Sequence, residues 1–347
     1  MEEFFIHPNA GQITLSTVVQ AVASMIVIPY LSLALGGVIV AIIADLRGMT
    51  KSCAVRRSFA GNFVKSIANN FGVGFVLGVV PILAVAFSFS QFMYGADSPV
   101  VSYFLYAAFF NLVGFLFLGK YKEVFDIIGH VDDSEKNHHY LEEIGLAEIY
   151  SGFAAVAFLF LGAFFLIGGY AIALDPELWQ HGFVVIFLSI QVWFKFIAFL
   201  CGSFAFAGVS VYFFFCVWTD TAKDISENLK NMATLVGGTL ALIFTPLFTL
   251  FTALHLKWIP RTDYSFGVVF FAALAVITLF FVLHMAYYTI AHRHVVAGAM
   301  GFVLFVSAFV FCILADSFSL NNAVREHVAE ITKTSGDSHD THGDDGH

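Results

Sequence analysis

The chain has 347 residues, of which 59% are hydrophobic and only 12% are charged, and 43 of them are phenylalanine. This composition, with a mean hydropathy of +0.84, lies far outside the range in which soluble domains stay dispersed. No phosphate-binding loop, nucleophile elbow or nucleic-acid footprint is present. We therefore predict an integral membrane protein, with the lipid bilayer as its surroundings and no nucleic-acid partner.

Apolar runs divide the chain into eight predicted membrane spans. Each span needs about 20 consecutive apolar residues to cross the hydrocarbon core. The predicted fold class is therefore all-α, with eight transmembrane helices. We place these at about 12–43, 71–92, 100–119, 147–173, 183–217, 232–255, 265–290 and 295–315.

Lysine and arginine residues concentrate in the loops on one side of these spans, which predicts the cytoplasmic side. Both termini are then expected outside, and the acidic opening MEEFFIHPNAGQ lacks the basic start of a signal peptide. We expect a multi-pass protein of the bacterial inner (cytoplasmic) membrane. The residues that carry this prediction are Arg47, Lys51, Arg56, Arg57, Lys65, Lys120, Lys122, Lys136, Lys223, Lys230 and Arg293.

An internal repeat indicates two parallel four-helix units. YLSLALGGVIV, which starts at Tyr30, resembles CGSFAFAGVSV, which starts at Cys201, and the same offset pairs Gln20 with Gln191. A slightly shorter offset pairs Pro81 with Pro246. We expect residues 1–146 plus 147–180 to form the first unit, residues 181–315 the second, and residues 316–347 a polar, acidic, histidine-containing tail without order.

Two stretches carry a resemblance to a known family. FGVGFVLGVVPILAVAFSF, Phe71–Phe89, resembles the second span of subunit I of the cytochrome bd quinol oxidases, and IPYLSLALGGVIVAII, Ile28–Ile43, is similar to its proline-containing first span. The resemblance implies a respiratory function with haem b and quinone as possible cofactors. The shared elements in the second span are Phe75, Gly78, Val79, Phe87 and Phe89.

The departures from that family concern its haem ligands. Ser24 stands where the family has a first-span histidine, Ala86 replaces an acidic residue, and no histidine occurs between Phe183 and Trp218. The usual three-haem centre is therefore expected to be absent or heavily altered.

The histidines beside or within spans are the candidate haem ligands of this chain. His7, His181 and His255 lie beside spans one, five and six, where they are either ligands or interfacial residues with one wet face. His284 is the only histidine well inside a predicted span, and an ionisable residue there indicates a functional site, either for haem or for quinone.

Lys195 lies about thirteen residues into the predicted fifth span and aligns with Ser24 through the repeat. Because a lysine in hydrocarbon is costly, we expect it to point into the bundle, toward Gln20, Ser24 or Gln191. It either fills a vacated haem pocket or contacts a haem propionate or a quinone carbonyl.

The remaining polar residues predict no metal centre. The four cysteines form no CxxC or CxxCH, and the loop from Lys120 to Glu148 is expected to be solvated despite its acids and histidines. The carboxylates nearest to spans fall at their ends, which disfavours a proton pump or an ion-coupled carrier. These carboxylates are Asp45, Glu148, Asp175 and Asp316.

Two classes of function follow from the sequence. The first is a membrane subunit of a respiratory electron-transfer complex that scaffolds haem-bearing partners, among them possible c-type cytochromes, as part of a quinol-dependent oxidoreductase. The second is a non-redox transporter or channel built by internal duplication, with Lys195 at its substrate site. A purely structural assembly subunit is a third, weaker alternative. Catalytic residues stay unassigned.

Overall fold

The computed structural model describes residues 10–51, 53–68, 70–130, 138–218, 225–258, 265–292 and 295–340. Side chains are described in the same ranges apart from 10, 128–130, 138–148, 295 and 330–340. Within these ranges the chain is helical and contains no strand, and eight helices are long and apolar enough to cross a membrane. The predicted all-α membrane fold is confirmed.

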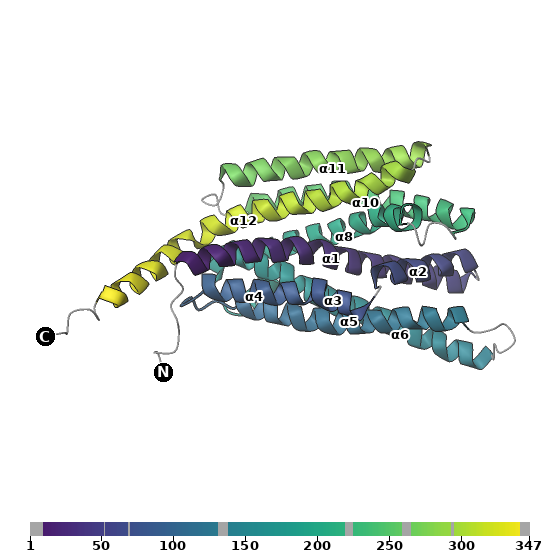
Figure 1. The fold of residues 1–347 in the computed structure, drawn as a ribbon, viewed down its shortest axis with the longest axis horizontal. Helices are drawn as coiled ribbons and strands as arrows, with labels where there is room; N and C mark the ends of the chain where they lie inside the picture. Colours follow the sequence, from purple (N-terminus) through teal and green to yellow (C-terminus); the bar gives the residue numbers. More distant parts are fainter. Residues whose placement is uncertain are drawn as a thin grey trace.

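The helices follow one another in antiparallel order, so that α1 begins and α12 ends at the same end of the bundle (Figure 1). We call this the terminal end. The elements are α1 (Ala10–Thr50), α2 (Ala54–Ile67), α3 (Phe71–Gly78), α4 (Val80–Phe92), α5 (Val100–His130), α6 (His138–Ala173), the short η2 (Pro176–Leu178) and α7 (Val185–Leu188), α8 (Ile190–Cys216), α10 (Glu227–Trp258), α11 (Phe266–His292) and α12 (Val295–Asp340).

The two repeat-related prolines affect their helices differently. The second span is divided at Val79 into α3 and α4, because Pro81 has no N–H to donate to the carbonyl of Leu77. Pro246 also removes one backbone hydrogen bond of its helix, but α10 continues through it as one helix. Neighbouring helices stabilise such interrupted segments inside a bilayer.

The two halves of the chain have the same order of neighbours. In the first, α1 packs on α4, α4 on α5, and α5 on α6, which returns to α1. In the second, α8, α10, α11 and α12 form the corresponding ring. The halves meet through α1 and α8, where the repeat partners Ser32 and Ser203 share a buried hydrogen bond of 3.1 Å. A Cβ on Gly36 would lie 2.2 Å from the backbone oxygen of Ser203, so only glycine permits this approach.

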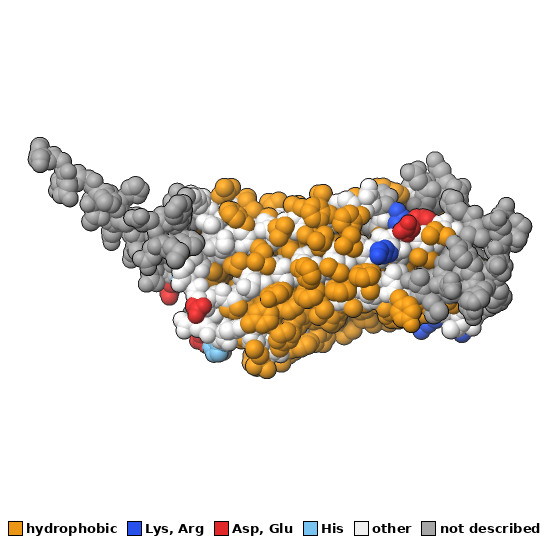
Figure 2. All heavy atoms as spheres, turned by 90° about the horizontal axis from the view of Figure 1, so that it is seen from below, with side chains coloured by type: hydrophobic (Ala, Val, Ile, Leu, Met, Phe, Trp, Pro, Cys, Tyr) orange, Lys and Arg blue, Asp and Glu red, His pale blue; other side chains and the backbone are white. Residues whose placement is uncertain are grey.

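Hydrophobic side chains cover the middle of the molecular surface in Figure 2, and charged side chains lie toward its ends. This distribution suits a hydrocarbon environment around the middle of the bundle. At the end opposite the terminal one, α2 buries Phe59 and Phe63, and its Arg57 pairs with the buried Asp45 of α1 at 3.4 Å. Lys65 pairs with Asp126 of α5 at 2.8 Å, which joins α2 to the first unit.

Among the span boundaries that differ from those expected, two affect the second unit most. The fifth transmembrane helix begins at Ile190 rather than near residue 183, because the backbone leaves helical geometry at Ser189. The eighth continues past residue 315: residues 316–340, which the composition assigned to a disordered tail, are helical, and 341–347 lie outside the described residues. The reason is that Leu320, Ala323 and Val324 keep an apolar face buried among polar neighbours.

Candidate functional site

The first turns of α8 carry two polar side chains on one face. Gln191 and Lys195 are four residues apart, which places them one above the other along a helix. Both are buried, Lys195 with 9% of its surface exposed. A polar face at this depth requires partners from the helices packed against it.

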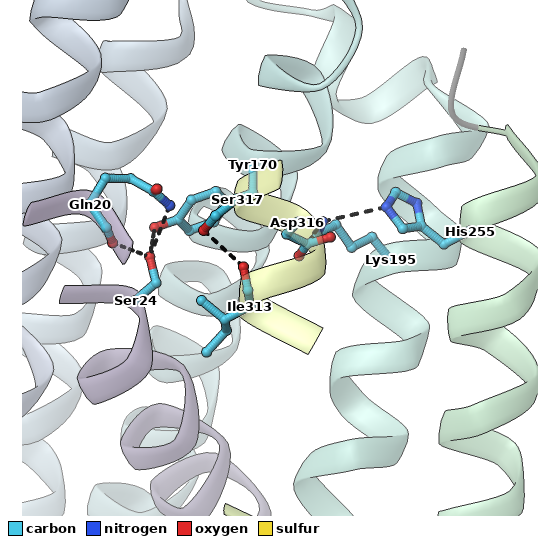
Figure 3. A network of polar contacts seen from close by, with 8 residues as sticks. All are labelled: Gln20, Ser24, Tyr170, Lys195, His255, Ile313, Asp316 and Ser317. Carbon is cyan, nitrogen blue, oxygen red and sulfur yellow. Dashed lines mark hydrogen bonds and ion pairs between the residues drawn. The ribbon is translucent and has the colours of Figure 1, made fainter. Parts of the chain in front are cut away.

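Lys195 is held by groups from two other helices (Figure 3). Its Nζ donates to Oδ2 of Asp316 on α12 at 2.8 Å, and lies 3.4 Å from Nε2 of His255 on α10. Asp316 is partly buried, with 30% of its side chain exposed, whereas His255 is 3% exposed. The ion pair compensates the charge of each partner, since removal of either would leave the other charge uncompensated.

These partners differ from the ones expected for Lys195. Its predicted burial in the bundle is confirmed, but the predicted contacts with Gln20, Ser24 or Gln191 are replaced by Asp316 and His255. Because α8 starts at Ile190, Lys195 lies about 8 Å from the helix start, nearer the membrane surface than a thirteen-residue depth implied. Asp316 reaches it because α12 stays helical beyond residue 315.

His255 keeps unused hydrogen-bonding capacity. An ammonium at Lys195 donates to Nε2, which puts the ring proton on Nδ1. Nδ1 is buried and makes no hydrogen bond of ordinary geometry, although the backbone carbonyl of Gln191 lies nearby. Because the Gln191 carbonyl is close, Nδ1 is a donor that either this carbonyl or a bound molecule can accept.

An apolar cavity of about 120 Å³ adjoins this cluster, in the interior of the second unit. Its walls come mainly from α8, α10, α11 and α12. Lys195, His255 and Asp316 line the part nearest the terminal end, whereas the deeper wall is apolar, with Phe199, Phe248, Leu279 and Phe309. Apolar pockets with a few convergent polar groups are the usual form of small-molecule sites.

The cavity reaches the membrane-facing surface between α10 and α11. Ala253 of α10 and Val276 of α11 both line it, and both are exposed on the outside of the bundle. A hydrophobic molecule dissolved in the bilayer could therefore enter sideways.

The repeat-related cluster of the first unit is neutral. Gln20 donates through Nε2 to Oγ of Ser24 at 3.2 Å, and Ser24 shares a hydrogen bond with the hydroxyl of Tyr170 on α6. The rings of Phe89 and Phe104 pack on Tyr170, with centroids 5.8 and 5.1 Å away. Aromatic packing therefore fills the space beside this cluster.

Gln191 does not form the predicted contact with Lys195 but forms hydrogen bonds at the terminal end of the second unit. Its amide donates to Oδ2 of Asp175 at 2.7 Å and to the backbone oxygen of Trp258 at 3.1 Å. These bonds join the start of α8 to the connection after α6 and to the last residue of α10.

The other predicted site residues are not brought to the cavity. His181 is exposed in the connection before α7, and His284 is exposed on the outer face of α11. His7 and residues 131–137 of the acidic loop after Lys120 lie outside the described residues, and no side chain is described between 128 and 148. No group of three or more His, Cys, Asp or Glu side chains that could hold a metal ion occurs in the part of the chain searched, which comprises the described residues.

Asp316 is the site residue that the sequence analysis missed. Its sequence signal was the apolar spacing of Leu320, Ala323 and Val324 after it, which continues the helical face of the eighth span. A search of models of known protein families found no match to this chain, and a search of curated proteins found none. The resemblance to the cytochrome bd oxidases thus stays a hypothesis, and function must be argued from the site.

Proposed function

We propose that this chain is a membrane subunit of a bacterial respiratory electron-transfer complex and binds a quinone in the cavity of its second unit. The observation that carries the proposal is the apolar cavity with Lys195, His255 and Asp316 at one end. A quinone matches it, because its ring and isoprenoid tail are apolar while its two carbonyl oxygens need hydrogen-bond donors. The opening between α10 and α11 suits a tail that extends into the lipid.

Lys195, His255 and Asp316 supply the hydrogen-bond donors and the proton acceptor that a quinone site needs. Lys195 and the Nδ1–H of His255 are donors for a quinone oxygen, and the carboxylate of Asp316 is an acceptor for a quinol hydroxyl. Oxidation of a quinol to a quinone releases two electrons and two protons. In this proposal the carboxylate of Asp316, which is 30% exposed, takes the two protons one after the other and passes each to water, and the electrons pass to a haem on a partner subunit.

The surroundings of the described histidines support a haem on a partner subunit rather than on this chain. Among the histidines whose side chains the structure describes, three are exposed, namely His181, His284 and His292. His255 contacts Lys195, and the ring of His327 lies 3.0 Å from the backbone oxygen of Tyr94, so none of the five is a free buried ligand. We therefore propose that this chain scaffolds a haem-bearing partner, such as a c-type cytochrome at the terminal end, in the bacterial inner membrane. A reduced-minus-oxidised spectrum should show haem in the complex from native membranes and none in the chain alone. A b-type signal from the chain alone that falls in His284→Ala would contradict this assignment.

A photoreactive azido-quinone tests the cavity directly. We expect it to label peptides of α10 or α11, and excess menaquinone or ubiquinone to suppress the labelling. The double variant Lys195→Met/Asp316→Leu keeps the charge balanced and should lose at least tenfold in labelling. Ser24→Ala, at the repeat-related position of Lys195, is the matched control and should label normally. Equal labelling of the double variant and the control would overturn the proposal.

A transporter is the second candidate, and the buried pair between Lys195 and Asp316 favours it. The sequence analysis disfavoured ion coupling because no carboxylate lay inside a span, but Asp316 lies within the eighth membrane helix. Protonation of such a carboxylate would release Lys195 to bind an anionic substrate. Proton uptake by proteoliposomes of the chain alone, abolished in Asp316→Asn, would favour this candidate over the quinone site.

A further inference from the structure

The outer face of α11 carries a continuous exposed stripe whose residues recur at alternating spacings of three and four. It consists of Phe270, Ala273, Ile277, Phe280, His284 and Tyr287. The opposite face of the same helix, with Val268, Ala275 and Val282, is buried in the second unit. A stripe with this spacing has the form of a helix-packing seam.

His284 interrupts the apolar character of this stripe at the depth of the hydrocarbon. The 27 residues of α11 span roughly 40 Å, against a hydrocarbon thickness of about 30 Å. His284 precedes the helix end at His292 by eight residues, so it lies roughly 7 Å inside the hydrocarbon. It is exposed and forms no hydrogen bond or ion pair with any residue that the structure describes.

An imidazole that faces lipid without a partner is unfavourable, since polar groups inside membranes are normally satisfied by other protein groups. The side chain of histidine is also too short to reach the headgroups from this depth. The unsatisfied histidine indicates that protein rather than lipid covers this face, and the stripe around it has the spacing on which a partner helix packs.

We propose that the exposed stripe of α11 is the docking seam for a transmembrane helix of a different subunit, which places a carboxylate or amide oxygen opposite His284. A second copy of this chain fits less well, because the stripe contains no acid or amide and would bring two histidines together. This surface is separate from the quinone cavity, so either proposal can fail while the other holds.

Photo-crosslinking in native membranes tests the seam. The photoreactive residue p-benzoylphenylalanine is introduced at Phe280, and in a matched control at Phe109, an exposed phenylalanine of α5 in the first unit. We expect the Phe280 site to give one protein adduct and the Phe109 site to give lipid adducts. The adduct peptide should come from a transmembrane segment that has Asp, Glu, Asn or Gln within one helical turn of the linked residue.

Variants of His284 test whether a hydrogen bond from this histidine is needed for the partner helix to bind. His284→Leu should lower the yield of the protein adduct by about fivefold or more, whereas His284→Gln, which still donates a hydrogen bond, should largely keep it. Lipid adducts alone at Phe280, a homodimer adduct, or equal yields in His284→Leu and the parent chain would each overturn the proposal.

Discussion

The two four-helix units carry polar clusters at related positions, but the clusters differ in charge and in the space beside them. In the first unit, Ser24 and Tyr170 form a neutral contact, and phenylalanine rings fill the space around it. In the second, Lys195 and Asp316 form an ion pair beside an open cavity. Both clusters join the first helix of a unit to its fourth, so they share a structural role. Only the second combines charge with space, and this difference locates the candidate site.

The largest expected change in stability comes from breaking the ion pair of the second unit. Asp316→Ala leaves Lys195 as an uncompensated buried charge and should lower the free energy of unfolding by roughly 3–5 kcal/mol. Lys195→Met/Asp316→Leu should be near neutral, because no charge is left unpaired. Unfolding in mild detergent measures both. Similar losses in the single and the double variant would show that packing, not charge, dominates the cluster.

A smaller effect on stability distinguishes the cavity beside Lys195 from a tightly packed position of the first unit. Ala275→Leu adds volume beside the cavity and should leave stability nearly unchanged while it weakens quinone labelling. Ala107→Leu adds the same volume at a fully buried position of the first unit and should cost about 1–3 kcal/mol. Thermal unfolding of the two variants checks the contrast. Equal losses of stability in the two variants would show that the second unit has no free space beside Ala275.

The neutral cluster should contribute to stability alone. Tyr170→Phe removes the hydroxyl that meets Ser24 and should cost roughly 0.5–1.5 kcal/mol. Azido-quinone labelling of the second unit should remain at the parent level. A large loss of labelling in this variant would mean that the two clusters act as one site.

The smallest expected effect lies where the two units meet. Ser32→Ala removes the hydrogen bond to Ser203 and should cost about 0.6 kcal/mol, the average for such bonds between membrane helices. Gly36→Ala is the contrasting variant, since its added Cβ would overlap the backbone oxygen of Ser203 and force α1 and α8 apart. Equal stability of these two variants would argue against the close approach of the helices.

Parts of the candidate site could be recognised in the sequence, because burial of a charge is visible from its apolar neighbours. His255 was named only as a histidine beside the sixth span, whereas Lys195 was singled out in this way. The partner of Lys195 was not, since Asp316 lies where hydropathy falls and the span appears to end. Hydropathy averages over all faces of a helix, whereas the continuation of α12 depends on one narrow buried face.

The sequence by itself determined the class of protein and the number of its membrane helices. Long apolar runs can satisfy their backbone groups in a bilayer only as helices, whatever surrounds them. Only the tertiary structure decided which helices surround the cavity, that Lys195 meets Asp316 and His255, and that His284 faces outward. These contacts join α8, α10 and α12, which are distant in sequence, so they depend on how the helices pack and rotate against one another.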